Sequence, residues 1–110
     1  MTLTSIISIL IAHFIGDFVL QTNWMSLNKA KNFKPLLAHI AVYTACLMVF
    51  GYKFALLNGF AHLCTDLVSS RVTYYLWNQG KVHWFFIVLG VDQLIHYICL
   101  FGSYQLLIGG

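Results

Sequence analysis

Three short stretches place a histidine and an aspartate four residues apart inside strongly apolar sequence. They are His13 with Asp17, His62 with Asp66, and Asp92 with His96, and together they contain every acidic residue of the chain. Residues four apart in a helix lie on the same face, one turn above the other. Imidazoles and carboxylates presented together bind zinc, manganese or iron, and they transfer protons in hydrolytic reactions.

The cost of burying these aspartates argues that they have a function. An aspartate in the middle of a membrane helix costs about 2.5–3.5 kcal/mol. Three of them cost roughly 8–10 kcal/mol, which is comparable with the net stability of an ordinary domain. Hydrogen bonds between membrane helices, the purely structural alternative, average only about 0.6 kcal/mol. We therefore expect a proton, a partner or a cation to offset the charge.

The composition predicts that the surroundings of these residues are a lipid bilayer. Sixty per cent of the 110 residues are hydrophobic and 8% are charged, whereas an ordinary soluble domain has about 25% charged residues. The net charge is +3, and the six lysines and arginines are spread over the loops. They form no basic stripe that would indicate nucleic-acid binding. The partner that we predict is the bilayer, together with further copies of the chain in a homo-oligomer.

Four apolar stretches are long enough to be predicted as membrane helices, and strands are excluded because the stretches are unbroken rather than alternating. The expected ranges are Leu3–Gln21, Pro35–Phe50, a helix from Phe54 that becomes interfacial through residues 69–78, and Val82–Leu107. Residues 22–34 are expected to form a polar loop, and Gly51 and residues 79–81 to break the chain. The predicted fold is all-α: residues 1–110 form a single transmembrane four-helix domain, a bundle with a polar interior layer.

Basic residues predict the orientation of this bundle. Five of the six lysines and arginines lie in or beside the first and third connections, and Lys53 alone lies in the second. Because positive charge favours the cytoplasmic side, we expect both termini outside the cytoplasm. The tryptophans at positions 24, 77 and 84 all fall at the predicted cytoplasmic interface, which aromatic rings favour.

The polar positions of the four helices then fall within about one helical turn of the same depth. The candidate metal ligands are His13, Asp17, His39, His62, Asp66, Asp92 and His96, and the three aspartates are also the candidate catalytic carboxylates. Gln21 and Gln93 are expected to orient these ligands from outside. Seven candidates exceed the four ligands of one tetrahedral ion, which leaves either a second metal ion or outer partners.

The motifs HFIGDFVLQT, HLCTDLVSSR and DQLIH resemble a family of small bacterial and phage membrane proteins catalogued only as a domain of unknown function (the DUF3307 type). The resemblance covers nearly the whole chain. The matching positions are His13, Gly16, Asp17, Phe18, Gln21, His39, His62, Asp66, Asp92, Gln93 and His96. It implies a location in the cytoplasmic (inner) membrane of a bacterium. It implies no activity, because none is established for the family.

Three hypotheses follow for the function. The first is a metal-dependent hydrolase acting on a lipid-linked or amphipathic substrate, with a divalent zinc, manganese or iron ion as cofactor. The second is a proton or metal-ion transporter or channel component, since Asp and His chains are common proton relays. The third is a non-catalytic accessory protein whose polar core only holds the bundle together.

Overall fold

The computed structural model describes residues 2–108 and confirms the all-α prediction. Its elements are α1 (Leu3–Phe14), a π-helical turn η1 (Ile15–Val19), α2 (Asn23–Asn28), α3 (Phe33–Leu47), a 3₁₀ turn η2 (Met48–Phe50), α4 (Tyr52–Asn78) and α5 (Val82–Leu107). Within the described residues there is no strand.

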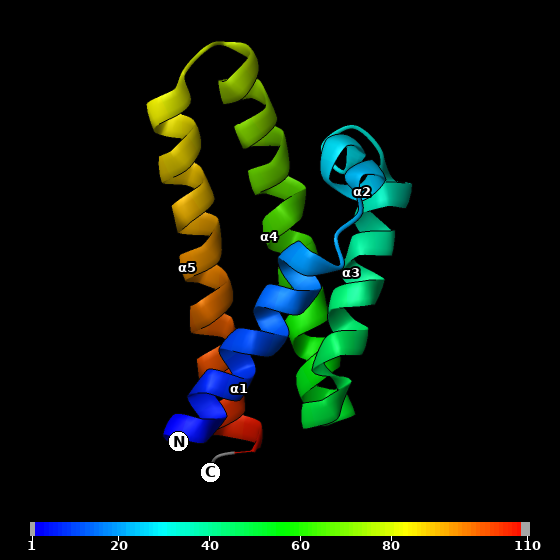
Figure 1. Cartoon of the computed structure of the whole chain (residues 1–110), viewed down its shortest axis with the longest axis vertical. Coiled ribbons are helices and arrows are strands. Elements are labelled where there is room, and N and C mark those ends of the chain that lie inside the picture. The colour runs from blue at the N-terminus through cyan, green and yellow to red at the C-terminus, as the bar shows by residue number, and fades with distance from the viewer. Residues whose placement is uncertain (1, 109–110) are drawn as a thin grey trace.

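The longest helices, α4 and α5, form an antiparallel hairpin, and α3 runs antiparallel to α4 beside its first half (Figure 1). The helix α1 crosses this group obliquely, and the short α2 lies above the start of α3 (Figure 1). The start of α1 and the end of α5 lie at the same end of the bundle, which we call the terminal end; we call the opposite end the hairpin end.

Two glycines end helices where the sequence predicted breaks. Gly51 separates η2 from α4 with φ of +115°, and Gly80 lies in the turn between α4 and α5 with φ of +72°. Side chains other than glycine rarely adopt these left-handed conformations. The last helix, Val82–Leu107, agrees with its predicted range.

Two local predictions were wrong. The first helix was expected to continue regularly to Gln21, but it widens into the π-helical turn η1 and ends before Leu20. Residues 22–34 were expected to be a loop, but they contain α2, whose first turn is capped by the Thr22 side chain accepting a hydrogen bond from the Met25 N–H at 3.2 Å. A capping threonine before a short helix is a helix-start signal. The polar and basic composition of residues 22–34 favoured a loop instead.

Two helical stretches, Phe33–Phe50 and Val82–Leu107, are long and apolar enough to cross a membrane, and Leu3–Val19 is apolar but shorter. The helix α4 has 27 residues but carries Lys53, Asp66 and Arg71. Length and composition therefore support two of the four predicted spans.

The terminal end of the bundle has an apolar core. Its buried members are Ile9, Tyr43, Leu47, Phe54, Ala55 and Leu100, which come from α1, α3, α4 and α5. Asn58 on α4 donates a 2.8 Å hydrogen bond to Ser103 on α5 and holds these two helices together beside the core.

A close approach between α3 and α4 depends on Gly59. A Cβ atom at this position would lie 2.1 Å from the Thr44 Oγ1 and 3.3 Å from its Cβ. Small residues allow helices to pack this tightly in membranes.

We predict that Gly59→Ala lowers the free energy of unfolding by about 1–3 kcal/mol, because the added methyl group overpacks the α3–α4 contact. Gly90→Ala is the matched control, since nothing lies within 4 Å of a Cβ there. Thermal unfolding of the purified variants measures the difference. The double variant Thr44→Ala/Gly59→Ala should recover most of the lost stability. If Gly59→Ala and Gly90→Ala are equally stable, the close α3–α4 contact does not limit the residue at position 59.

Candidate functional site

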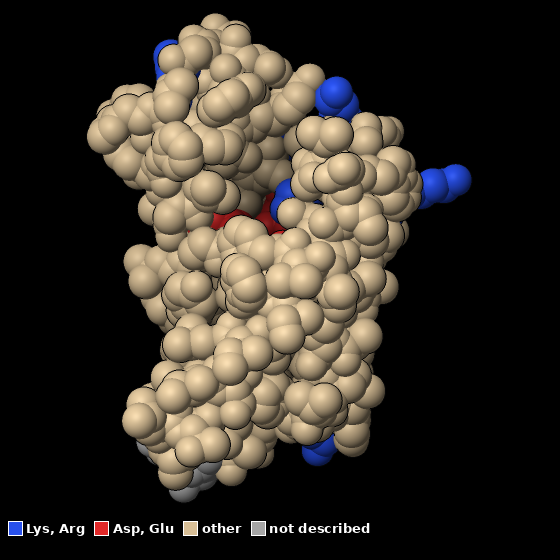
Figure 2. All heavy atoms as spheres, viewed as in Figure 1, with Lys and Arg blue, Asp and Glu red and all other residues tan. Residues whose placement is uncertain are grey.

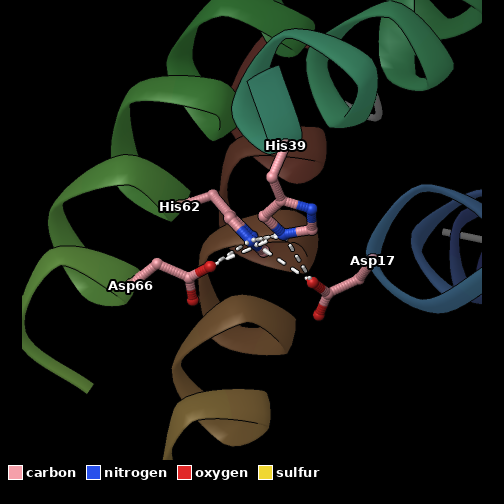
Figure 3. A group of neighbouring side chains, drawn as sticks. All are labelled: Asp17, His39, His62 and Asp66. Atoms are coloured by element: carbon pink, nitrogen blue, oxygen red, sulfur yellow. Dashed lines mark hydrogen bonds and ion pairs between the residues drawn. The ribbon is translucent and has the colours of Figure 1, made fainter. Parts of the chain in front are cut away.

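Four side chains from three different elements meet in the interior of the bundle (Figure 3). They are Asp17 from η1, His39 from α3, and His62 and Asp66 from α4. All four are buried, and one potential ligand atom from each lies within 4.8 Å of the others. The arrangement therefore presents two nitrogens and two oxygens to one point.

The distances among these atoms fit a metal ion. His39 Nε2 lies 3.0 Å from Asp17 Oδ1, 3.0 Å from His62 Nε2 and 3.5 Å from Asp66 Oδ2. His62 Nε2 lies 3.4 Å from Asp17 Oδ1 and 3.2 Å from Asp66 Oδ2. Ligand atoms placed tetrahedrally at zinc distances are about 3.3 Å apart. Five of the six separations thus match the edges of one tetrahedral coordination sphere.

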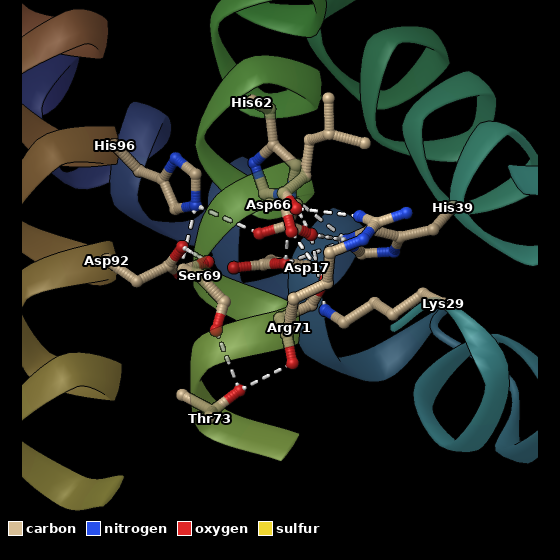
Figure 4. A network of polar contacts seen from close by, with 12 residues as sticks. Asp17, Lys29, His39, His62, Asp66, Ser69, Arg71, Thr73, Asp92 and His96 are labelled. Carbon is tan, nitrogen blue, oxygen red and sulfur yellow. Dashed lines mark hydrogen bonds and ion pairs between the residues drawn. The ribbon is translucent and has the colours of Figure 1, made fainter. Parts of the chain in front are cut away.

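A second group adjoins the first. Asp92 and His96, one turn apart on α5, share Asp17 with the first group, and again the three ligand atoms lie within 4.8 Å of one another. The His96 Nε2 lies 3.1 Å from Asp92 Oδ2, and the Ser69 hydroxyl donates to Asp92 Oδ1. Figure 4 shows the two groups as one continuous polar network between α4, α5, η1 and α3.

A chain of hydrogen bonds fixes the Asp17 carboxylate from the α5 side. Gln93 Nε2 donates to Asp17 Oδ2 at 3.1 Å, and Gln93 Oε1 accepts from His13 Nε2 at 2.8 Å. The other ring nitrogen of His13 accepts from the Tyr43 hydroxyl at 2.9 Å. Such outer partners commonly orient metal ligands.

The π-helical turn explains how Asp17 reaches the centre. Its wider turn changes the register after α1, and Gly16 allows close contact with α3, because a Cβ there would lie 3.3 Å from the Cα of Tyr43. The helix then ends, so Gln21 does not continue the His13–Asp17 face. In α4, by contrast, regular helical spacing alone places His62 and Asp66 one above the other.

Lys29 supplies a positive charge to the site from the end of α2. Its Nζ lies 3.2 Å from Asp66 Oδ2, and its side chain is 19% exposed. The sequence pattern indicated no role at the site for this residue. The sequence shows only that Lys29 lies in a polar connection, and Lys31 lies in the same connection. In the structure, however, the Lys31 Nζ lies over the Tyr74 ring, 5.1 Å from its centroid.

A cavity of about 880 Å³ leads from the surface to this site. Asp66 and Asp92 lie in its wall with Lys29, and its apolar lining includes Trp77 and Phe86. Figure 2 shows acidic atoms at the bottom of a hollow with a basic group beside them. The cavity lies between α2, α4 and α5, toward the hairpin end.

Of the seven candidate ligands from the sequence, the structure brings six into the two groups: Asp17, His39, His62, Asp66, Asp92 and His96. His13 lies outside both groups, because both its ring nitrogens are hydrogen-bonded to Tyr43 and Gln93. Gln93 has the orienting position predicted for it. Gln21 does not, since it lines the cavity and its Oε1 has no hydrogen-bond partner among residues 2–108.

The model of the family described as "Protein of unknown function (DUF3307)" matches residues 5–109. The chain belongs to this family. The match confirms the resemblance seen in the motifs, and it covers every residue of both candidate ligand groups. Searches of curated proteins and of solved structures found no match. The DUF3307 family itself brings no activity, so the site is interpreted from its own geometry.

The Lys29–Asp66 pair yields a testable prediction. In chelator-treated protein, Lys29→Gln should lower the free energy of unfolding by about 1–3 kcal/mol, because the buried Asp66 carboxylate loses a charged partner. Lys31→Gln is the matched control on the same connection and should have a smaller effect. Chemical unfolding of the three proteins measures this. Equal stability of the two variants would show that Lys29 does not support the buried carboxylate.

Proposed function

We propose that this chain is an integral membrane protein whose four long helical segments all cross the bilayer. The distribution of side chains supports this proposal. The buried interior includes four histidines and three aspartates, whereas large apolar side chains such as Phe14, Leu57, Phe60, Val68 and Ile98 are exposed on the outside. Soluble proteins rarely expose contiguous apolar surface on this scale. Lipid would cover it.

Basic residues support an orientation with the cavity open to the cytoplasm. On the face shown in Figure 2, lysine and arginine atoms are visible mainly toward the hairpin end, and basic atoms are also visible at the terminal end. Lys53 belongs to the first turn of α4, beside Gly51. Positive charge marks the cytoplasmic side, so both chain ends would face away from the cytoplasm.

We infer that the buried site binds a divalent metal ion and hydrolyses an amphipathic or lipid-linked substrate. The observation that carries this inference is the set of two imidazoles and two carboxylates with tetrahedral spacing beside a cavity. His39, His62, Asp17 and Asp66 would hold the ion. An ion that takes a water molecule as a further ligand would activate it as a nucleophile and polarise a phosphoryl or acyl oxygen.

The remaining residues have roles that follow from their positions. Gln93 would hold Asp17 in its liganding orientation through the hydrogen bond at 3.1 Å. Asp92 and His96 would complete the polar site from the α5 side, where Asp92 lines the cavity together with Asp66. Lys29 would attract a negatively charged group of the substrate into the cavity.

The cavity supports an amphipathic substrate. Its inner part carries Asp66, Ser69 and Lys29, while its walls toward the hairpin end carry aromatic side chains such as Trp77 and Phe85. A polar head would therefore lie at the site, and an apolar chain would lie along α4 and α5. A substrate without an apolar part would gain nothing from these walls.

Transport was the second hypothesis, and the packing at the terminal end favours the hydrolase over it. The core side chains Tyr43, Leu47, Phe54 and Leu100 fill the interior between the site and that end. An ion that entered from the cavity would meet this apolar layer. The site is thus open from one side, as an enzyme requires and a channel does not.

We expect metal-loaded protein in mixed micelles to hydrolyse an amphiphilic phosphate or carboxylic ester. Asp66→Asn should lower turnover by roughly two orders of magnitude or more, because a ligand is lost. Gln93→Ala should lower it by about 10–100-fold, as removal of outer partners commonly does. His83→Gln, a change to an exposed histidine on α5, is the control and should retain activity.

Release of product from a panel of phosphate and carboxylic esters measures this activity. Metal-loaded, folded protein that turns over no member of the panel would contradict the hydrolase. Turnover that is unchanged in Asp66→Asn would place the activity elsewhere.

The orientation is testable by labelling single cysteines in intact cells. We expect a cysteine at Gly80 to be protected from a membrane-impermeant maleimide and one at Gly51 to be labelled, in a chain whose three native cysteines are replaced by serine. Replacement is structurally mild because Cys46, Cys64 and Cys99 are unpaired. Labelling of both positions, or the reverse pattern, would contradict the proposed topology.

A further inference from the structure

We propose that the site holds two divalent cations bridged by the carboxylates of Asp17 and Asp66, with the second cation bound by Asp92 and His96. This rests on the proposed metal site and specifies its nuclearity. The sequence left open whether the surplus ligands serve a second ion or only orient the first. The geometry of α5 relative to α4 and η1 favours the second ion.

The two oxygens of Asp66 face the two halves of the site. Asp66 Oδ2 lies 3.2 Å from His62 Nε2 and 3.5 Å from His39 Nε2, in the first group. Asp66 Oδ1 lies 3.7 Å from His96 Nε2, in the second group. A carboxylate in this position can give one oxygen to each of two ions.

Asp17 has the same double role. Its Oδ1 faces His39 and His62, at 3.0 and 3.4 Å. Its Oδ2 faces α5, where it accepts the hydrogen bond from Gln93. Asp17 is also the residue that belongs to both groups of closely spaced ligands.

His96 provides an independent indication of a ligand. Its side chain is 2% exposed, yet its Nε2 has no hydrogen-bond partner among the described residues. The nitrogen lies 3.1 Å from Asp92 Oδ2 without the alignment that a hydrogen bond needs. A buried imidazole nitrogen between two carboxylates, without a hydrogen bond, is suited to a cation.

The spacing of the two halves fits a pair of ions. The rings of His62 and His96 are stacked with centroids 4.0 Å apart and planes inclined by 13°. Ions bound in the ring planes by the Nε2 atoms of two such stacked imidazoles would be separated by a similar distance. Two-metal hydrolytic sites have ions about 3.5–4 Å apart, which bind both the attacking and the leaving oxygen.

Charge then indicates the class of substrate. Three carboxylates carry three negative charges, and two divalent cations carry four positive charges, to which Lys29 adds one more beside Asp66. The loaded site would therefore have a net positive charge. Such a site favours a phosphate ester over a neutral carboxylic ester.

The test is manganese binding to the full-length protein in detergent micelles. At saturating Mn²⁺, elemental analysis after gel filtration should give two ions per chain. Electron paramagnetic resonance should show a spin-coupled pair rather than the hyperfine pattern of isolated Mn²⁺. Neither readout requires turnover.

Asp92→Asn and His96→Gln should each reduce the content to one ion per chain and restore the isolated-ion spectrum. Ser103→Ala is the matched control on the same helix, because Ser103 is buried and hydrogen-bonded to Asn58 away from the site. It should retain two coupled ions. If a ligand variant does not fold, the spectrum of the unaltered protein still shows whether two adjacent ions are bound.

One ion per chain, or two ions without spin coupling, would overturn this inference in the unaltered protein. Loss of both ions together in Asp92→Asn would overturn it too, because the first ion should remain bound by its own ligands when the second site is removed. The proposed hydrolase fails differently: a coupled pair without turnover would contradict the enzyme alone, and turnover with a single ion would contradict the ion pair alone.

Discussion

The burial of negative charge is the constraint on which this structure depends. All three carboxylates of the chain lie in the interior, at 2–6% exposure, and they come from three different elements. Removing charges from water costs several kcal/mol each unless they are paired and hydrogen-bonded. In this structure the partners of the carboxylates include imidazoles, the amide of Gln93 and the ammonium group of Lys29. The potential ligand atoms are also spaced as they would be around a cation. A bound cation would neutralise the negative charge of the aspartates.

The parts of the site that follow from regular helical spacing were predictable from the sequence. His62 with Asp66, and Asp92 with His96, are one turn apart in helices whose ranges the hydropathy pattern indicated well. Contacts between helices were less predictable. The central position of His39 and the bridge from Gln93 to Asp17 depend on how α3 and α5 pack, and no pattern within one helix encodes that packing. The π-helical turn at Asp17 and the ion pair from Lys29 had no local signal.

The bundle has three structurally different regions along its length. The terminal end has an apolar core, the middle has the polar network, and the hairpin end contains the cavity between α2, α4 and α5. The close contacts at Gly16 and Gly59 bring η1 and α4 against α3, so the same packing that stabilises the bundle also assembles the ligands. This explains how so short a chain can build a buried site: each of its main helices supplies part of it.

X-ray absorption at the zinc edge of zinc-loaded protein would show whether the buried histidines and aspartates surround an ion. We expect a shell of nitrogen and oxygen ligands at about 2.0–2.1 Å, with the outer scattering of imidazole rings, and loss of part of that scattering in His62→Gln. A spectrum of fully hydrated zinc without imidazole scattering, or one that His62→Gln leaves unchanged, would show that the buried histidines and aspartates do not meet around a metal ion.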